Sequence, residues 1–77
     1  MDATQRIEIA ETVANRISQC DELRSTARVW AKSRHVRVYV RMDGRDIGYI
    51  SVDADGELEA NISRRKGSVM SAARGER

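Results

Sequence analysis

The sequence predicts an α+β domain, with an N-terminal helix packed on a three-stranded antiparallel meander and a short C-terminal helix or tail. Two observations predict this class. The spacing of apolar residues changes from a helical period to a period of two near residue 35. Two Asp-Gly turns, at Asp43-Gly44 and Asp55-Gly56, flank an alternating segment. Because 77 residues suffice for one small domain only, we treat residues 1–77 as a single unit.

The predicted helix begins at Asp2, whose carboxylate can accept from the free N–H groups of the first turn, with Gln5 completing a capping box. The following apolar residues share one helical face: Ala3, Ile7, Ala10, Val13, Ala14 and Ile17. A second stripe is rotated by roughly a quarter turn: Cys20, Leu23, Ala27, Trp30 and Ala31. We therefore expect either a helix that bends or splits near residues 18–21, or a helix with two apolar faces.

Alternation of apolar and polar residues predicts three strands, roughly His35 to Arg41, Asp46 to Val52 and Glu57 to Ser63. The first connection is expected to be a type I turn with a glycine bulge, because this turn keeps the valines of both strands on one face. It would pair Arg41 with Arg45.

The same register rule then places Val38 opposite Gly48 in the first hairpin. In the second hairpin it places Val52 opposite Leu58, Ile50 opposite Ala60 and Gly48 opposite Ile62. Gly48 lies at the centre of the apolar face. We expect the missing side chain to leave room either for the helix to approach or for Trp30 to fill the gap.

The opposite, outward face of this predicted sheet carries an aromatic and aliphatic patch framed by arginines. Its members are Arg37, Tyr39, Arg41, Ile47 and Tyr49. Three explanations compete: a solvated face, a contact with a protein, and a contact with nucleic acid. A protein contact leads, because Tyr and Arg often carry the binding energy of interfaces. Nucleic acid is the alternative, with bases stacked on the two tyrosines and arginines bound to phosphates.

A basic run, Arg64, Arg65 and Lys66, precedes the predicted C-terminal helix of residues 68–74. Basic side chains at a helix N-terminus attract anions, so the run is a candidate contact for nucleic acid or another anion. The competing explanation is that the three charges are simply solvated. Few apolar residues follow, and residues 67–77 are expected to be a mobile tail.

Catalytic chemistry is not indicated. Cys20 and His35 are the only residues of their types and fall in different predicted elements. Pairs of Cys or His ligands are absent, and the acidic residues after Val52 fail the spacing of a calcium loop. We expect no enzyme activity, no cofactor and no metal. The sequence shows neither a secretion signal nor a membrane span, so we expect a cytoplasmic protein without membrane contact.

The predicted order of one helix, three strands and a short helix resembles that of double-stranded-RNA-binding domains, and "RRKGSVMSAA" is similar to the basic start of their last helix. The resemblance covers topology only, and the tight first hairpin departs from the longer loop of that family. The meander followed by a basic segment also resembles small ribonuclease toxins, whose leading strand has no counterpart here.

The sequence as a whole favours a non-enzymatic binding module that contacts a protein partner through the outer sheet face. This is the manner of compact adaptors or inhibitors encoded by phages and plasmids. The alternative is an RNA- or DNA-binding protein. The net charge, 14 Lys and Arg against 12 Asp and Glu, is too small to attract a partner by itself. Because the chain lacks Phe and its core must be thin, we also expect a homodimer.

Overall fold

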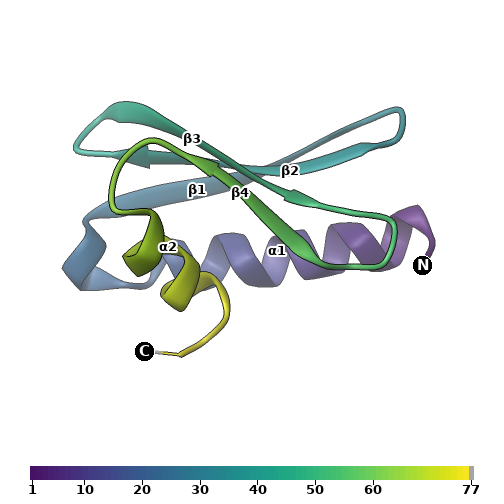
Figure 1. Ribbon diagram of the computed structural model, residues 1–77, viewed down its shortest axis with the longest axis horizontal. Helices are drawn as coiled ribbons and strands as arrows, with labels where there is room; N and C mark the ends of the chain where they lie inside the picture. The colour runs from purple at the N-terminus through teal and green to yellow at the C-terminus, as the bar shows by residue number, and fades with distance from the viewer. Residues whose placement is uncertain (77) are drawn as a thin grey trace.

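The computed structural model describes residues 1–76, which form two α-helices, a short 3-10 helix and one antiparallel sheet (Figure 1). The elements are α1 (Ala3–Ser18), η1 (Asp21–Leu23), β1 (Ser25–Lys32), β2 (His35–Met42), β3 (Arg45–Val52), β4 (Leu58–Ile62) and α2 (Lys66–Ala73). The four strands follow the order β1-β2-β3-β4. Both α-helices lie on the same side of the sheet, so the other side carries no helix (Figure 1).

The prediction of three strands is wrong, because Ser25–Lys32 form a fourth strand along the edge of the sheet. This segment pairs with β2 over its full length. The helical interpretation failed because Ala27 and Ala31 fit a helical stripe as well as a two-residue alternation. In addition, the turn between β1 and β2 is built from Ser33 and Arg34. Ser33 has a φ of 56°, a conformation that usually requires glycine, so the sequence lacks the glycine that would have indicated a turn here.

The helix α1 begins as predicted, with a complete capping box. The Asp2 carboxylate accepts from the Gln5 N–H at 2.8 Å, and the Gln5 side chain accepts from the Asp2 N–H at 3.1 Å. The helix then ends at Ser18. Of the alternatives for residues 18–21, the break is the one that occurs, and η1 followed by Arg24 at a φ of 50° turns the chain into β1.

The core lies between the sheet and the two α-helices and is built entirely from aliphatic side chains and methionine. Its members are Ala10, Val13, Ala14, Ile17, Leu23, Val36, Val38, Val40, Met42, Ile47, Ile50, Val52, Val69, Met70, Ala72 and Ala73. None of them is more than 6% exposed. The β-branched residues that favour strands therefore also fill the interior of this domain.

The first hairpin differs from the prediction in its turn and its register. Asp43 and Gly44 form a two-residue turn with φ values of 53° and 76°, which is the type I′ geometry. The bulge lies inside β3 instead: Val40, and not Val38, faces Gly48, and Ile47 has no partner on β2. Moving the extra residue from the turn into the strand keeps the valines facing the core.

The register predicted for the second hairpin is confirmed, with Gly48 opposite Ile62. Gly48 has a φ of 126°, and a Cβ at this position would overlap the carbonyl oxygen of Asn61 on β4. The glycine is therefore required for the close approach of β4. Both expectations for Gly48 are therefore wrong. The residue does not make room for the helix, and Trp30 cannot fill a gap beside it because Trp30 lies on the other face of the sheet.

The segment predicted to be a mobile tail from residue 67 contains most of α2. Four side chains of this helix are buried: Val69, Met70, Ala72 and Ala73. The Arg16 side chain of α1 donates to the carbonyl of Ala73 at 3.2 Å, which ties the two helices together. Arg77, the last residue of the predicted tail, lies outside the described residues. Neither helix in residues 1–76 has the length and apolar character needed to cross a membrane.

Candidate binding surface on the outer face of the sheet

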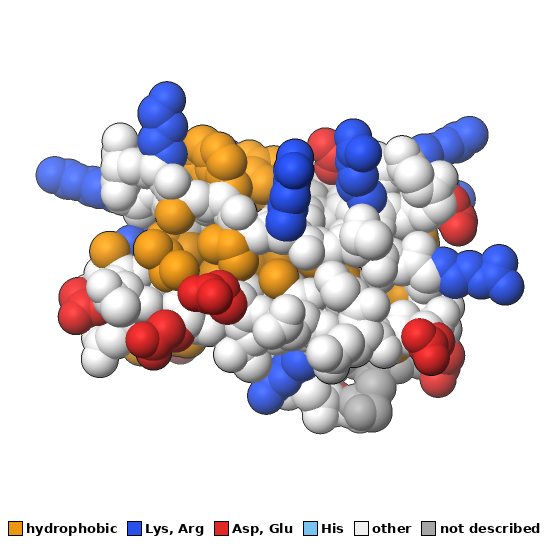
Figure 2. Space-filling model, turned by 180° about the vertical axis from the view of Figure 1, so that it is seen from behind, with side chains coloured by type: hydrophobic (Ala, Val, Ile, Leu, Met, Phe, Trp, Pro, Cys, Tyr) orange, Lys and Arg blue, Asp and Glu red, His pale blue; other side chains and the backbone are white. Residues whose placement is uncertain are grey.

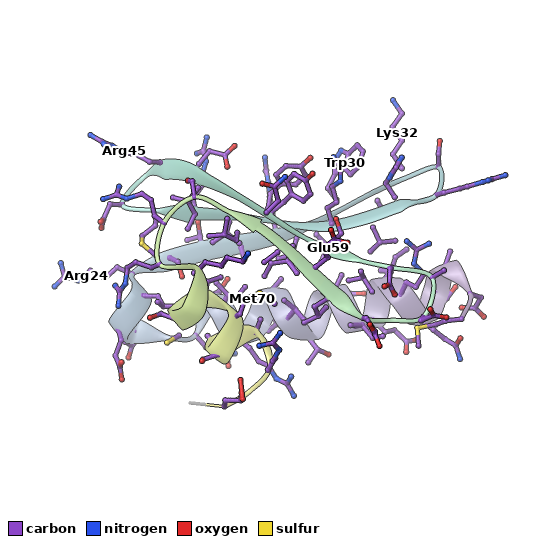
Figure 3. The ribbon with its side chains drawn as sticks, viewed as in Figure 1. Arg24, Trp30, Lys32, Arg45, Glu59 and Met70 are labelled. Atoms are coloured by element: carbon purple, nitrogen blue, oxygen red, sulfur yellow. The ribbon has the colours of Figure 1, made fainter. Side chains whose placement is uncertain are left out.

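Every aromatic side chain of the protein lies on the outer face of the sheet. The chain contains one Trp, two Tyr and no Phe. The rings of Trp30 and Tyr39 are 6.1 Å apart in an edge-to-face arrangement, and those of Tyr39 and Tyr49 are 5.5 Å apart. We call these three residues together with Arg37 the aromatic cluster. Figure 3 shows Trp30 projecting from the sheet on the side opposite to α1.

Strand register brings the cluster together. Trp30 on β1 lies directly opposite Arg37 on β2, and Tyr39 on β2 lies directly opposite Tyr49 on β3. Residues at every second position of a strand share a face, so Arg37 and Tyr39 are also neighbours along β2. Cross-strand pairs of this kind stabilise a sheet by up to about 1 kcal/mol each. The cluster spans three adjacent strands as a result.

Arg37 is the centre of the cluster. Its guanidinium carbon lies 4.4 Å from the centroid of the Tyr49 ring and 5.6 Å from that of Trp30. It also donates a hydrogen bond to the Tyr39 hydroxyl at 3.1 Å. That hydrogen bond, helped by the charge interactions with both tyrosines, raises the pKa of the Arg37 guanidinium above its ordinary value. The Arg37 guanidinium, a cation as in every arginine, thus contacts all three rings.

Both tyrosine hydroxyls act as acceptors within the sheet. Tyr39 accepts from Arg37, and Tyr49 accepts from the Asn61 side chain at 3.2 Å. A phenol carries one proton that it can donate in addition to accepting. Each hydroxyl therefore keeps its own proton for an acceptor outside the chain, such as a carboxylate.

Basic side chains surround the cluster on the β1 and β2 side. Arg28, Lys32 and Arg41 occupy the same alternating positions as Trp30 and Tyr39, and all three are exposed. Figure 2 shows Lys and Arg side chains projecting from the sheet side of the molecule, at the top of the view. Acidic groups lie on β3 and β4, where Asp46 is exposed opposite Arg41 and Glu59 is exposed as well. The surface is thus basic on one side and mixed on the other.

Four of the five residues predicted for this surface lie on it: Arg37, Tyr39, Arg41 and Tyr49. The placement of Ile47 is a correction. Ile47 is only 2% exposed, because as the extra residue of the β3 bulge it turns into the core. Sequence reasoning missed Trp30 and Arg28, since their segment was assigned to a helix. The signal that could have found them is the alternation of Arg28, Trp30 and Lys32 with small apolar residues.

The predicted basic run lies apart from the aromatic cluster. Arg64 and Arg65 are exposed on the connection that leads from β4 at the edge of the sheet to α2 in the helix layer, and Lys66 is the exposed first residue of α2. Arg65 has a φ of 51° and is the N-cap of α2, with no side-chain hydrogen bond to the helix. These three cations are not brought to the rings.

Residues 1–76 contain no group of three or more His, Cys, Asp and Glu side chains able to hold a metal ion. Cys20 precedes η1 and His35 begins β2, which places them at opposite ends of β1. Comparison with protein families, curated proteins and solved structures gives no match. Functional inference therefore rests on the geometry of the outer sheet face.

Proposed function

We propose that the protein is a non-enzymatic binding module that holds a protein partner with acidic groups on the outer face of its sheet. The observation that carries this proposal is the location of the rings. Trp30, Tyr39 and Tyr49 all lie on the exposed face, and the core contains no aromatic side chain.

Aromatic side chains bury roughly 150–250 Å² each and supply large stabilisation when water is removed from them. A domain of 77 residues gains little stability from its thin core. Because every ring lies outside that core, the free protein lacks much of the stabilisation that buried rings would supply. A partner that covers the cluster would recover it. Trp, Tyr and Arg are also the residue types that dominate the binding energy of protein interfaces.

The cluster is already ordered before binding. Arg37 is held by contacts with two rings and by a hydrogen bond to the third, and Asn61 fixes the Tyr49 hydroxyl. Immobilising a side chain on binding costs roughly 0.5–1.5 kcal/mol, so a pre-ordered surface loses less free energy when it binds.

Charge identifies the class of partner. The exposed cations Arg28, Lys32 and Arg41 flank the rings, and the two tyrosine hydroxyls can each donate to an acceptor. Carboxylates satisfy both requirements, since they are anionic and accept hydrogen bonds. Complementary charge also speeds encounter and excludes partners of the wrong sign.

Nucleic acid is the second candidate, and one observation favours it. A four-stranded antiparallel sheet with aromatic and basic side chains on its central strands is a surface on which RNA-binding modules stack bases. The Arg37 guanidinium, however, lies over the Tyr49 ring at 4.4 Å. A base would have to displace this cation before it could stack there, so we rank the protein partner first.

Affinity capture from the native host tests the proposal. The baits are the wild type, the double variant Tyr39→Ala/Tyr49→Ala, and the control Thr4→Ala/Glu8→Ala on exposed positions of α1. A partner that binds the cluster is retained by the wild type and the control and lost from the tyrosine variant. A tyrosine variant that retains the same partners as the wild type contradicts the proposal.

Titration with mixed-sequence single-stranded RNA and DNA separates the two candidates. Phosphate contacts predict affinity that falls steeply between low and physiological salt and that is lost in the tyrosine variant. This result would show that the cluster binds nucleic acid and would contradict the proposal of a protein partner. Absence of binding at low salt removes the second candidate.

A further inference from the structure

The strand β1 forms an edge of the sheet whose main-chain groups are partly free. The Ser18 hydroxyl accepts from the Ala27 N–H at 3.1 Å and lies 3.4 Å from the Ala27 carbonyl, to which it donates. Both groups of Ala27 therefore point away from β2. Residues at every second position repeat this direction, so the N–H and C=O groups of Val29 and Ala31 point outward too. No strand of residues 1–76 lies beyond β1.

This edge has little of the usual protection against another strand. Natural sheets guard their edges with proline, bulges, charges that point inward and charged side chains on the edge strand. Of these devices β1 carries the last, in Arg28 and Lys32. Here the bulge is in β3, the chain contains no proline, and small apolar side chains occupy the helix side of the edge. Trp30, 38% exposed, lies on the other side. Figure 2 views the molecule from the side opposite to Figure 1 and shows hydrophobic side chains gathered on the surface of that side.

We propose that the edge of β1 binds the same edge of a second copy of the chain, antiparallel and about a two-fold axis at Trp30, to form an eight-stranded sheet. In this register Val29 lies opposite Ala31 of the second copy, and Ala31 opposite Val29. Four main-chain hydrogen bonds form. The inference stands on the free edge and not on the proposed function, which it extends by joining two aromatic clusters into one surface.

The free groups select this register. Opposite residues must share a face, so the axis can fall at Val29, Trp30 or Ala31 but not between residues. With the axis at Val29, Ala31 would meet Ala27, whose groups are already bound to Ser18. With the axis at Ala31, Val29 would meet the turn residue Ser33. The axis at Trp30 alone pairs free groups with free groups at both positions.

The side chains at the axis agree with a second copy as the occupant. Trp30 would face Trp30 of the other chain in a non-hydrogen-bonded pair, the pair type in which side chains come closest. This contact would bury an exposed large apolar side chain. Arg28 would face Lys32 of the other chain. That like-charge pair weakens the dimer slightly, by an amount that salt screens.

Shape and charge at the end of the edge also favour a second copy. A hollow between α1 and the start of β1 is lined by Ile7, Glu11, Ala27 and Val29, among others. The register places the turn of Ser33 and Arg34 of the second copy beside Ala27, at this hollow. Arg34 is exposed and cationic. The hollow is lined by one carboxylate, Glu11, and one cation, Arg28, so Arg34 of the second copy would pair with Glu11 on the α1 side.

Sedimentation equilibrium over a range of concentrations tests the interface. The wild type is expected to approach twice 8.7 kDa. Ala31→Pro removes an outward N–H and no bond to β2, so the variant should fold. It should weaken dimerisation at least about 30-fold, because two hydrogen bonds are lost per dimer. Ala54→Pro, in the exposed turn before β4, is the control and should dimerise as the wild type does.

A wild type that stays monomeric at high micromolar concentration overturns the inference, as does a folded Ala31→Pro that dimerises normally. If that variant does not fold, amide exchange of the wild type decides: exchange at Val29 and Ala31 must slow as concentration rises. The register has its own test. Arg28→Glu would face Lys32 of the second copy and should tighten the dimer roughly fivefold at low salt. Weaker dimerisation would contradict an axis at Trp30.

Discussion

The two faces of this sheet are built from the same strands and carry different chemistry. The inner face presents aliphatic side chains and methionine, and those that form the core are at most 6% exposed. The outer face presents all three rings, held by Arg37 and surrounded by exposed cations. The difference shows that aliphatic side chains and methionine can fill a small core beneath two helices without any aromatic residue. The aromatic side chains, which would stabilise such a core most, remain available for recognition.

This division has a testable form. Truncating an inner residue should lower stability, and should lower binding only through the loss of folded protein. Truncating an outer residue should lower binding while most of the stability remains. Small domains have few kcal/mol of stability to lose, so the two kinds of effect must be measured separately on each variant.

The largest effect is expected at the centre of the inner face. Ile50 is fully buried, and Ile50→Ala should lower the free energy of unfolding by about 3 kcal/mol, through lost burial and the cavity left behind. Urea denaturation followed by circular dichroism measures the change. Ser51→Ala, the outward neighbour on the same strand, serves as the control and should cost under about 0.5 kcal/mol. Equal losses of unfolding free energy in both variants would contradict the proposed difference between the two faces.

A second loss of stability is expected where β4 approaches β3. Gly48→Ala should cost at least about 2 kcal/mol, because its Cβ would meet the Asn61 carbonyl and its φ of 126° is unfavourable for other residues. Gly67→Ala in α2 is the matched control. Open space surrounds that position, and helix propensity predicts a gain of about 0.5–1 kcal/mol. Thermal unfolding of both variants gives the comparison, and a tolerated Gly48→Ala would show that the strand approach is loose.

The smallest effect on stability belongs to the cap of α1. Asp2→Ala removes the carboxylate that accepts from Gln5 and should cost about 1 kcal/mol. The melting temperature should fall by a few degrees while partner affinity stays unchanged, since α1 lies on the inner side of the sheet. Thr4→Ala, an exposed neighbour without a capping role, should leave the melting temperature nearly unchanged. A loss of affinity in Asp2→Ala would extend the binding surface to the helix layer.

Residues 35–63 could largely be predicted because local chemistry marks their turns. The glycines of the two Asp-Gly pairs supply positive φ at no steric cost, and the alternation of valine with polar residues determines which face is buried. The position of the bulge could not be predicted. A bulge in the turn and one at Ile47 satisfy the same parity, and only the packing of Ile47 in the core separates them.

Strand β1 escaped prediction because its determinants are tertiary. Its turn to β2 contains Ser33 at positive φ rather than glycine, and the bond from Ala27 to Ser18 depends on how the chain folds back. The prediction of the binding surface was incomplete for the same reason, because the segment of β1 was assigned to a helix. Trp30 could be assigned to the surface only from the pairing of β1 with β2. The two tyrosines and Arg37 could be assigned from the sequence, because alternation along β2 and β3 shows which side chains point outward.

Affinity and stability of Tyr49→Ala, measured on the same sample with the captured partner, test the division of the two faces most directly. We predict at least about 30-fold weaker binding, because Tyr at the centre of an interface typically contributes 2 kcal/mol or more. The free energy of unfolding should fall by only about 1 kcal/mol. Affinity within twofold of the wild type, combined with a stability loss as large as that of Ile50→Ala, would contradict the account.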